Sequence, residues 1–292
     1  MTLALQPQTR AWLLQNAGRL DGLHIVLTGA TGSLGSHTCG ALLFLGARLT
    51  LPVRNPEKAA LLRSRLLDAF PGAHIALRHV DLERFASVDA LVKDLVTDGE
   101  PIDALIHNAG VFTKTGRQTE DGCELHWQIN AASPLRLTRG LLPLLRKSRS
   151  PRVVTVTSLA AKYSRPDVAD PQGRLLRSST RAYGRSKLMM AKEINALARE
   201  EPGIAFAFSH PGVSATGLFT AGAHPAAYSA AFLRLALPVM KRVFMEPEKA
   251  SLPTVLALCR ASGKAVLAEP RGPFHIWGYP RLRGLWPSMR LP

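Results

Sequence analysis

The sequence has few cysteines, and their arrangement excludes two classes of site. Cys39, Cys123 and Cys259 lie far apart and form no pair with the spacing of metal ligands. An odd and sparse set is typical of reduced thiols in the cytosol rather than of a disulfide framework. We therefore expect a cytoplasmic protein with no metal site.

Long apolar runs are also missing. The nearest to one, residues 226–240, contains Arg234 and Pro238, and the N-terminus lacks the basic-then-apolar pattern of a signal peptide. No linker rich in Pro, Ser or Gly, no low-complexity tract and no internal repeat interrupts the 292 residues. These absences predict a soluble chain with an N-terminal arm over residues 1–21 and one domain over residues 22–292.

Acidic residues are scarce relative to basic ones. The chain has 37 Lys and Arg against 21 Asp and Glu, a formal net charge of +16. Such a charge favours nucleic acid, an anionic membrane or an anionic ligand as a partner. The basic residues are scattered rather than gathered in one tract, so we interpret them as a generally basic surface and expect no nucleic-acid partner. The tail over 270–292 interleaves arginines with Tyr279 and Trp286, and we expect it to pack on its own domain or on a second copy of the chain.

Apolar segments rich in β-branched residues alternate with helical patterns along most of the chain. The expected strands are 23–27, 47–53, 74–80, 102–107, 152–157 and 204–209, with a last one at 273–277. The expected helices include 36–45, 56–70, 87–96, 122–146 and one that ends near Glu200. This alternation predicts an α/β fold: a single Rossmann-type, doubly wound domain with a mostly parallel sheet of six or seven strands and helices on both faces.

A glycine-rich turn follows the first expected strand and opens the first expected helix. Its residues with a predicted ligand role are Thr28, Gly29, Thr31, Gly32, Ser33, Leu34 and Gly35. Glycines let the backbone approach a pyrophosphate closely, and the helix N-terminus offers free N–H groups. A tight turn without a ligand is the alternative, but the flanking strand and helix favour dinucleotide binding.

The residue that follows the second strand indicates which dinucleotide is bound. An acidic residue there would bind the 2′-hydroxyl of NAD, but the chain offers Arg54 and no carboxylate before Glu57. A guanidinium group suits the 2′-phosphate of NADP(H). The alternative is that Arg54 only closes the loop.

Polar residues and turns recur just after the expected strands. Asp81, Asn108, Ser158 and Pro211 each follow the carboxyl end of a strand. Parallel strands in an open sheet end at one edge, where ligands bind. We therefore expect these residues to lie together. The histidines His79, His107 and His210 belong to no motif, and we interpret them as structural.

Tyr183 and Lys187 stand four residues apart in an expected helix, so their side chains leave the same face. An ammonium group near a phenol favours the phenolate and lowers the pKa of the phenol. The pair is suited to proton transfer. By itself it is equally consistent with a surface tyrosine beside a solvated lysine.

These motifs, in this order, resemble the short-chain dehydrogenase/reductase family over about residues 22–255. The interval from Ser158 to Tyr183 and the segment 53–58 resemble its retinol dehydrogenase and carbonyl reductase members. The single-domain branch usually reads T-G-x-x-x-G-x-G, which would place glycine at Ser33. Gly29, Gly32 and Gly35 instead have the spacing of the larger sugar-modifying branch.

The resemblance implies a role for each matching residue. Tyr183 would be the general acid/base, Lys187 would lower its pKa and hold the nicotinamide ribose, and Ser158 would bind the substrate oxygen. Asn130 would hold a water that links Lys187 to solvent. The further cofactor-binding residues implied are Asp81, Leu82, Asn108, Ala109, Gly110, Pro211, Gly212, Val213 and Thr216.

The expected activity is NADPH-dependent reduction of an apolar ketone or aldehyde, or oxidation of the matching alcohol, and the cofactor is NADP(H). Residues 217–245 are expected to form a lid over the substrate, although simple packing on the core, or a peripheral contact with an anionic membrane, would also explain their apolar face. A dinucleotide-sensing regulator without turnover is the alternative function. Homo-oligomers are frequent in the family, so a second copy of the chain is also a candidate partner.

Overall fold

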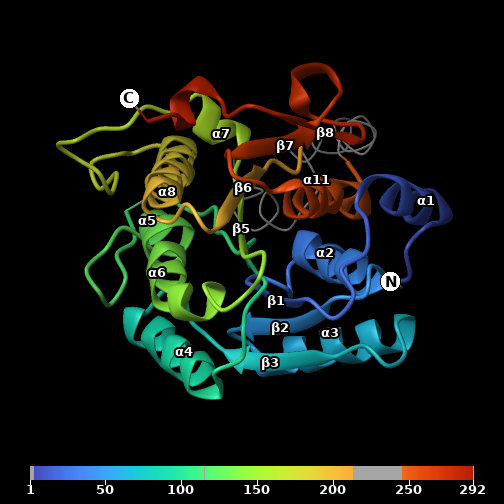
Figure 1. Ribbon diagram of the computed structural model, residues 1–292. Helices are drawn as coiled ribbons and strands as arrows, with labels where there is room; N and C mark the ends of the chain where they lie inside the picture. The colour runs from blue at the N-terminus through green and yellow to red at the C-terminus, as the bar shows by residue number, and fades with distance from the viewer. Residues whose placement is uncertain (1–2, 115, 213–244, 292) are drawn as a thin grey trace, which may run out of the picture.

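The computed structural model describes residues 3–114, 116–212 and 245–291, which form one mixed sheet with helices on both faces (Figure 1). The strand order is β3-β2-β1-β4-β5-β6-β7-β8. The strands are β1 (His24–Leu27), β2 (Arg48–Val53), β3 (Ile75–His79), β4 (Ala104–His107), β5 (Arg152–Val156), β6 (Ala205–Ser209), β7 (Val266–Pro270) and β8 (Pro280–Arg283). The expected fold class is confirmed, with eight strands in place of six or seven.

Helices cover both faces of the sheet because its strands are apolar on both sides. Leu42, Leu66 and Leu256 belong to one buried cluster, with α2 (Ser33–Phe44), α3 (Pro56–Ala69) and α11 (Pro247–Arg260). Leu91, Leu141 and Ile194 belong to the other, with α4 (Phe85–Asp98), α6 (Ser133–Leu145) and α8 (Ser179–Glu200). Figure 1 shows these two sets on opposite sides of the sheet.

The strand order reverses between β1 and β4. Strand β1 pairs in parallel with β2 on one side and with β4 on the other, with Val26 beside Leu105. The chain therefore leaves β1 and β4 at neighbouring points on the same edge of the sheet. Such a switch point is where open α/β sheets bind their ligands.

The N-terminal arm forms α1 (Pro7–Asn16). Leu13 is fully buried in the cluster that contains α2 and α11, and the backbone N–H of Gln6 donates to Glu248 Oε1 at 3.1 Å. The arm is thus packed on the same core as the rest of the described chain.

The single helix expected over 122–146 is instead three consecutive segments. They are the short helix α5 (Leu125–Trp127), a π-helical turn (Gln128–Ala132) and α6. A π-helical turn holds one more residue than an α-helical turn and is frequent at functional sites. Asn130 lies within it.

The prediction of a strand at 273–277 is wrong. Those residues form a 3₁₀ turn (Pro273–His275) between β7 and the antiparallel strand β8. Pro273 has no N–H to donate to a ladder, and Phe274 and His275 adopt positive φ angles of 55° and 61°, which a strand does not allow. The eighth strand comes from the tail residues that follow.

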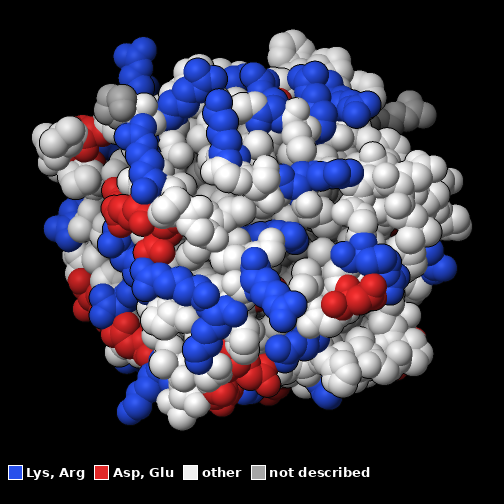
Figure 2. Space-filling model, viewed as in Figure 1, with Lys and Arg blue, Asp and Glu red and all other residues white. Residues whose placement is uncertain are grey.

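The lid expected over 217–245 lies outside the described residues except for Met245, which is buried. Within the described ranges, no helix is long and apolar enough to cross a bilayer. Figure 2 shows Lys and Arg at many separate places on the visible face, most numerous over its upper and central parts, so on this face they are not gathered in one tract.

The turn after β1 packs tightly against the residues after β4. Gly29 has a φ of +72°, and a Cβ atom on it would lie 2.7 Å from Ala109 Cα. A Cβ atom on Gly35 would overlap the Gly29 carbonyl oxygen and lie 2.8 Å from Asn108 Nδ2, whereas one on Gly32 would meet Gly29 O at an ordinary 3.4 Å. Two of the three glycines are therefore required by packing alone.

We expect Gly35→Ala to destabilise the fold by about 1–3 kcal/mol, the usual cost of inserting a methyl group where neighbours cannot move. Thermal unfolding measures the effect, and Gly32→Ala is the matched control, expected to unfold near the wild-type temperature. Equal losses in the two variants would contradict this packing.

Candidate functional site

A cleft of about 600 Å³ follows the carboxyl ends of strands β1 to β6. This size lies within the range of small-molecule sites, roughly 300–1,000 Å³. Of the predicted site residues that the structure describes, only Asn130 does not line the cleft. Those that do are Thr28, Gly29, Thr31, Gly32, Ser33, Leu34, Gly35, Arg54, Asp81, Leu82, Asn108, Ala109, Gly110, Ser158, Tyr183, Lys187, Pro211 and Gly212. Val213 and Thr216 lie outside the described residues.

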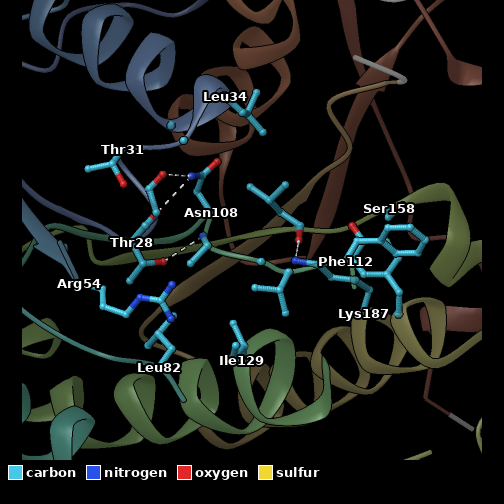
Figure 3. Close-up of a pocket in the computed structure, with 18 of the residues that line it drawn as sticks. Thr28, Thr31, Leu34, Arg54, Leu82, Asn108, Phe112, Ile129, Ser158 and Lys187 are labelled. Atoms are coloured by element: carbon cyan, nitrogen blue, oxygen red, sulfur yellow. Dashed lines mark hydrogen bonds between the residues drawn. The ribbon is translucent and has the colours of Figure 1, made fainter. Parts of the chain in front are cut away.

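The glycine turn is tied to the strand beside it by Asn108. Its Nδ2 donates to the carbonyl oxygens of Thr28 and Gly29, at 3.1 Å each, and Thr28 Oγ1 accepts from the N–H of Ala109 at 3.2 Å (Figure 3). Asn108 thus fixes the turn itself, in addition to the cofactor-binding role that the resemblance implied for it. Its Oδ1 is buried and accepts no hydrogen bond within the described chain.

The turn fits a pyrophosphate. Gly32 is the N-cap of α2, and no side chain caps this helix end, so the first backbone N–H groups face the cleft without a side-chain acceptor. At Gly32 no Cβ atom covers the backbone, and the N-terminal end of α2 carries a partial positive charge. The residues present therefore suit the phosphates of a dinucleotide.

Four charged residues surround the end of the cleft next to β2 and β3. Arg54 is 64% exposed and donates to Glu83 Oε1 at 2.9 Å, and its Nη1 lies 3.8 Å from Asp81 Oδ1. Arg117 pairs with the other oxygen of Glu83 at 2.6 Å. Arg54 and Arg117 thus share one carboxylate at the cleft.

Ser158, Tyr183 and Lys187 meet at the other end of the cleft. Ser158 follows β5 and caps the short helix α7 (Leu159–Lys162), and its side chain is close enough to Tyr183 to influence the pKa of the phenol. Tyr183 and Lys187 lie one turn apart on α8, and both are buried. The predicted set is therefore brought together in space.

Burial controls the protonation of this set. It raises the pKa of Tyr183 to about 12, while the hydrogen bond from Ser158 acts in the opposite direction. It also lowers the pKa of Lys187 to about 8. The expected lowering of the Tyr183 pKa by Lys187 is not found, because desolvation of the phenol outweighs its favourable contacts. Lys187 Nζ donates instead to the carbonyl oxygen of Val156 at 3.0 Å.

Asn130 does not line the cleft but hydrogen-bonds residues next to it. Its Oδ1 accepts from the N–H of Val111 at 2.8 Å, and its Nδ2 donates to Val111 O and to Ser186 Oγ, both at 3.0 Å. Both amide hydrogens are used, and one lone pair of Oδ1 remains. A Cβ atom on Gly110 would lie 3.2 Å from Asn130 Oδ1 and 3.0 Å from Lys187 Nζ, so both groups face the same side of that glycine.

Sequence reasoning missed several residues of the cleft. Phe112, Glu83, Arg117 and His210 line it without belonging to a recognised motif. Phe112 and Glu83 lie two residues beyond Gly110 and Asp81, and this proximity to strand ends is the one signal that pointed to them. His210, interpreted as structural, is buried and packs its ring on Trp286 at 5.8 Å, and it also lines the cleft.

His107 agrees with its structural interpretation. It is buried, it hydrogen-bonds Thr138 Oγ1 at 2.6 Å, and burial lowers its pKa to about 3. Within the described residues, no cluster of three His, Cys, Asp or Glu side chains has the arrangement of a metal site.

Comparison with known proteins agrees with this geometry. Residues 23–224 match the model of the short chain dehydrogenase family. Mouse (Mus musculus) retinol dehydrogenase 14 is 32% identical over 213 residues, which cover 69% of this chain and 64% of the relative. Human (Homo sapiens) retinol dehydrogenase 13 is 30% identical over 254 residues, covering 84% of this chain and 76% of the relative. The match to the mouse relative thus leaves about a third of that protein uncovered.

Solved structures share the fold. A protein from Mycobacterium Paratuberculosis superposes with a TM-score of 0.72 at 25% identity, covering 94% of this chain and 90% of the other. The RhlG/NADP active-site complex of Pseudomonas aeruginosa has a TM-score of 0.67 at 24% identity, with coverages of 88% and 98%. The family match, the relatives and the arrangement of the cleft agree that this chain belongs to the short-chain dehydrogenase family.

Proposed function

We propose that the protein is an NADPH-dependent oxidoreductase that reduces an apolar ketone or aldehyde, or oxidises the matching alcohol. The observation that carries the proposal is that Ser158, Tyr183 and Lys187 share one cleft with the glycine turn. A protein that only senses a dinucleotide has no need of a buried proton donor beside a hydroxyl and an ammonium group.

The glycine turn, Asn108 and the residues after β3 and β6 would hold the dinucleotide across the sheet edge. When bound, the dinucleotide supplies the hydride for the carbonyl carbon. Tyr183 would donate the proton to the carbonyl oxygen, and the Ser158 hydroxyl would hydrogen-bond that oxygen as negative charge develops on it. Lys187 would stabilise the phenolate that remains.

The protonation states are those from which carbonyl reduction would start. A pKa of about 12 keeps the Tyr183 phenol protonated at neutral pH, and a pKa of about 8 keeps Lys187 mostly charged. A proton donor next to a cation is the arrangement that protonating a carbonyl requires. Asn130, next to Lys187, would help to hold a water through which the proton is replaced.

The choice of NADPH rests on Arg54. Its guanidinium lies at the cleft beyond the end of β2, where it would pair with the 2′-phosphate. Glu83 already binds Arg54 and Arg117, so it would compete with the phosphate for both cations.

The proposal includes an apolar carbonyl compound as the substrate and the cytoplasm as the compartment. Phe112, Leu125 and Ile129 give the cleft an apolar wall, which suits an apolar carbonyl compound. The three cysteines are unpaired, which fits a reducing, cytoplasmic setting.

The direct test follows the oxidation of NADPH and NADH spectroscopically with a panel of apolar aldehydes and ketones. We expect turnover with NADPH, and a loss of roughly 100- to 10,000-fold in Tyr183→Phe because the proton donor is gone. Tyr163→Phe is the matched control, since Tyr163 is 77% exposed outside the cleft. Tight NADPH binding without turnover of any carbonyl would favour the sensor, and full activity in Tyr183→Phe would contradict the mechanism.

Substitution of Arg54 tests cofactor choice. We expect Arg54→Gln to raise the KM for NADPH roughly 10- to 100-fold, the value of a hydrogen bond to a charged group, and to leave the KM for NADH nearly unchanged. Glu83→Gln should lower the KM for NADPH because it removes the competing carboxylate. Arg65→Gln, at an exposed position of α3, is the control. Equal changes in the KM for NADPH and for NADH in Arg54→Gln would contradict the proposed contact of Arg54 with the 2′-phosphate.

A further inference from the structure

We infer that Phe112 forms the wall of the carbonyl site above Tyr183, and that the buried pair Glu124 and His126 positions it there. The inference rests on the proposed function, because it concerns how substrates are selected at the same cleft. It is carried by contacts that the proton relay does not use.

Phe112 touches the proton donor directly. Its ring stands edge-on to that of Tyr183, with ring centroids 5.4 Å apart and an angle of 86° between the planes, and Phe112 lines the cleft (Figure 3). Edge-to-face pairs of this kind are a favoured arrangement of aromatic rings. A carbonyl oxygen that reaches the Tyr183 hydroxyl must therefore place its substituents beside Phe112.

The backbone on both sides of Phe112 is held by one short stretch of helix. Before it, Val111 exchanges two hydrogen bonds with Asn130. After it, the N–H of Thr113 donates to His126 Nε2 at 3.1 Å. His126 and Asn130 stand on α5 and the π-helical turn that follows it. Two side chains of one element thus fix the residues that flank Phe112.

The hydrogen bonds of His126 determine where its proton lies. A backbone N–H can only donate, so Nε2 must be the unprotonated nitrogen. The other nitrogen, Nδ1, then carries the proton and donates it to Glu124 Oε1 at 2.7 Å. His126 is therefore a neutral imidazole in the Nδ1–H form, with both nitrogens used.

Glu124 fixes that form. Its second oxygen accepts from the N–H of Trp127 at 2.8 Å, and both Glu124 and His126 are almost completely buried, at 2% and 0% exposure. A buried carboxylate is costly unless its lone pairs are satisfied by donors. The same carboxylate caps the helix and orients the imidazole, so hydrogen bonds connect α5, the His126 ring and the backbone of Thr113. Glu124 and His126 are positioning residues, whereas Phe112 would touch the substrate.

Removal of the phenyl ring should widen the site without altering proton transfer. In Phe112→Ala we expect kcat/KM for 1-naphthaldehyde relative to benzaldehyde to rise about tenfold, a typical size for discrimination by an apolar pocket. Phe85→Ala, which removes a phenyl ring at the start of α4, is the control and should leave the ratio unchanged. An unchanged ratio in Phe112→Ala would overturn the assignment of the wall.

A double-mutant cycle tests whether His126 acts through Phe112. We expect His126→Leu to change the same ratio in the same direction, and to add nothing in the Phe112→Ala background. His126→Gln keeps one donor and one acceptor and should restore part of the wild-type ratio. Additive effects, or an equal loss of kcat with both aldehydes, would mean that His126 has only a structural role.

One measurement does not depend on turnover. In ¹⁵N-labelled enzyme at neutral pH, long-range ¹H–¹⁵N spectra should show His126, assigned by its loss in His126→Gln, as the neutral Nδ1–H form. An Nε2–H form or an imidazolium would overturn the positioning device. A failure to reduce any aldehyde or ketone would contradict the proposed function and leave this spectroscopic result to decide the role of His126.

Discussion

The buried ammonium group of Lys187 is the constraint on which the geometry of the cleft depends. It lines the cleft, donates to the carbonyl oxygen of Val156, and has a pKa lowered to about 8 by burial. Gly110 makes room for it, since a Cβ atom there would lie 3.0 Å from Lys187 Nζ. Because Lys187 and Tyr183 are one helical turn apart, the position of the lysine also fixes that of the phenol.

A second layer of contacts surrounds this pair. The π-helical turn places Asn130 against Val111 and Ser186, and the helix before it places His126 against Thr113. On the opposite side, Asn108 ties the glycine turn to β4. The segment that follows β4 therefore contacts the glycine turn through Asn108 and the helical residues behind Tyr183 and Lys187 through Val111 and Thr113.

Much of the fold and of the cleft could be predicted from the sequence, because parallel strands end at one edge of the sheet and the motif residues directly follow those strand ends. Ser158 and Asn108 were placed in this way. The role of Phe112 was not, because it depends on a contact with Tyr183 across 71 residues of chain that no local pattern encodes. Burial raises the pKa of Tyr183, whereas the sequence predicted that it would be lowered. The strand predicted at 273–277 does not form, because Phe274 and His275 adopt positive φ angles.

The most direct test of the account is the pH dependence of kcat/KM for carbonyl reduction with saturating NADPH, in wild type and Lys187→Met. A lysine with a lowered pKa is charged below that pKa and loses its charge as the pH rises through it. We predict that wild-type kcat/KM falls as the pH rises past about 8, or somewhat higher once the anionic cofactor is bound, and that this falling limb is absent in Lys187→Met. A wild-type profile that stays flat or rises across this range would contradict the account.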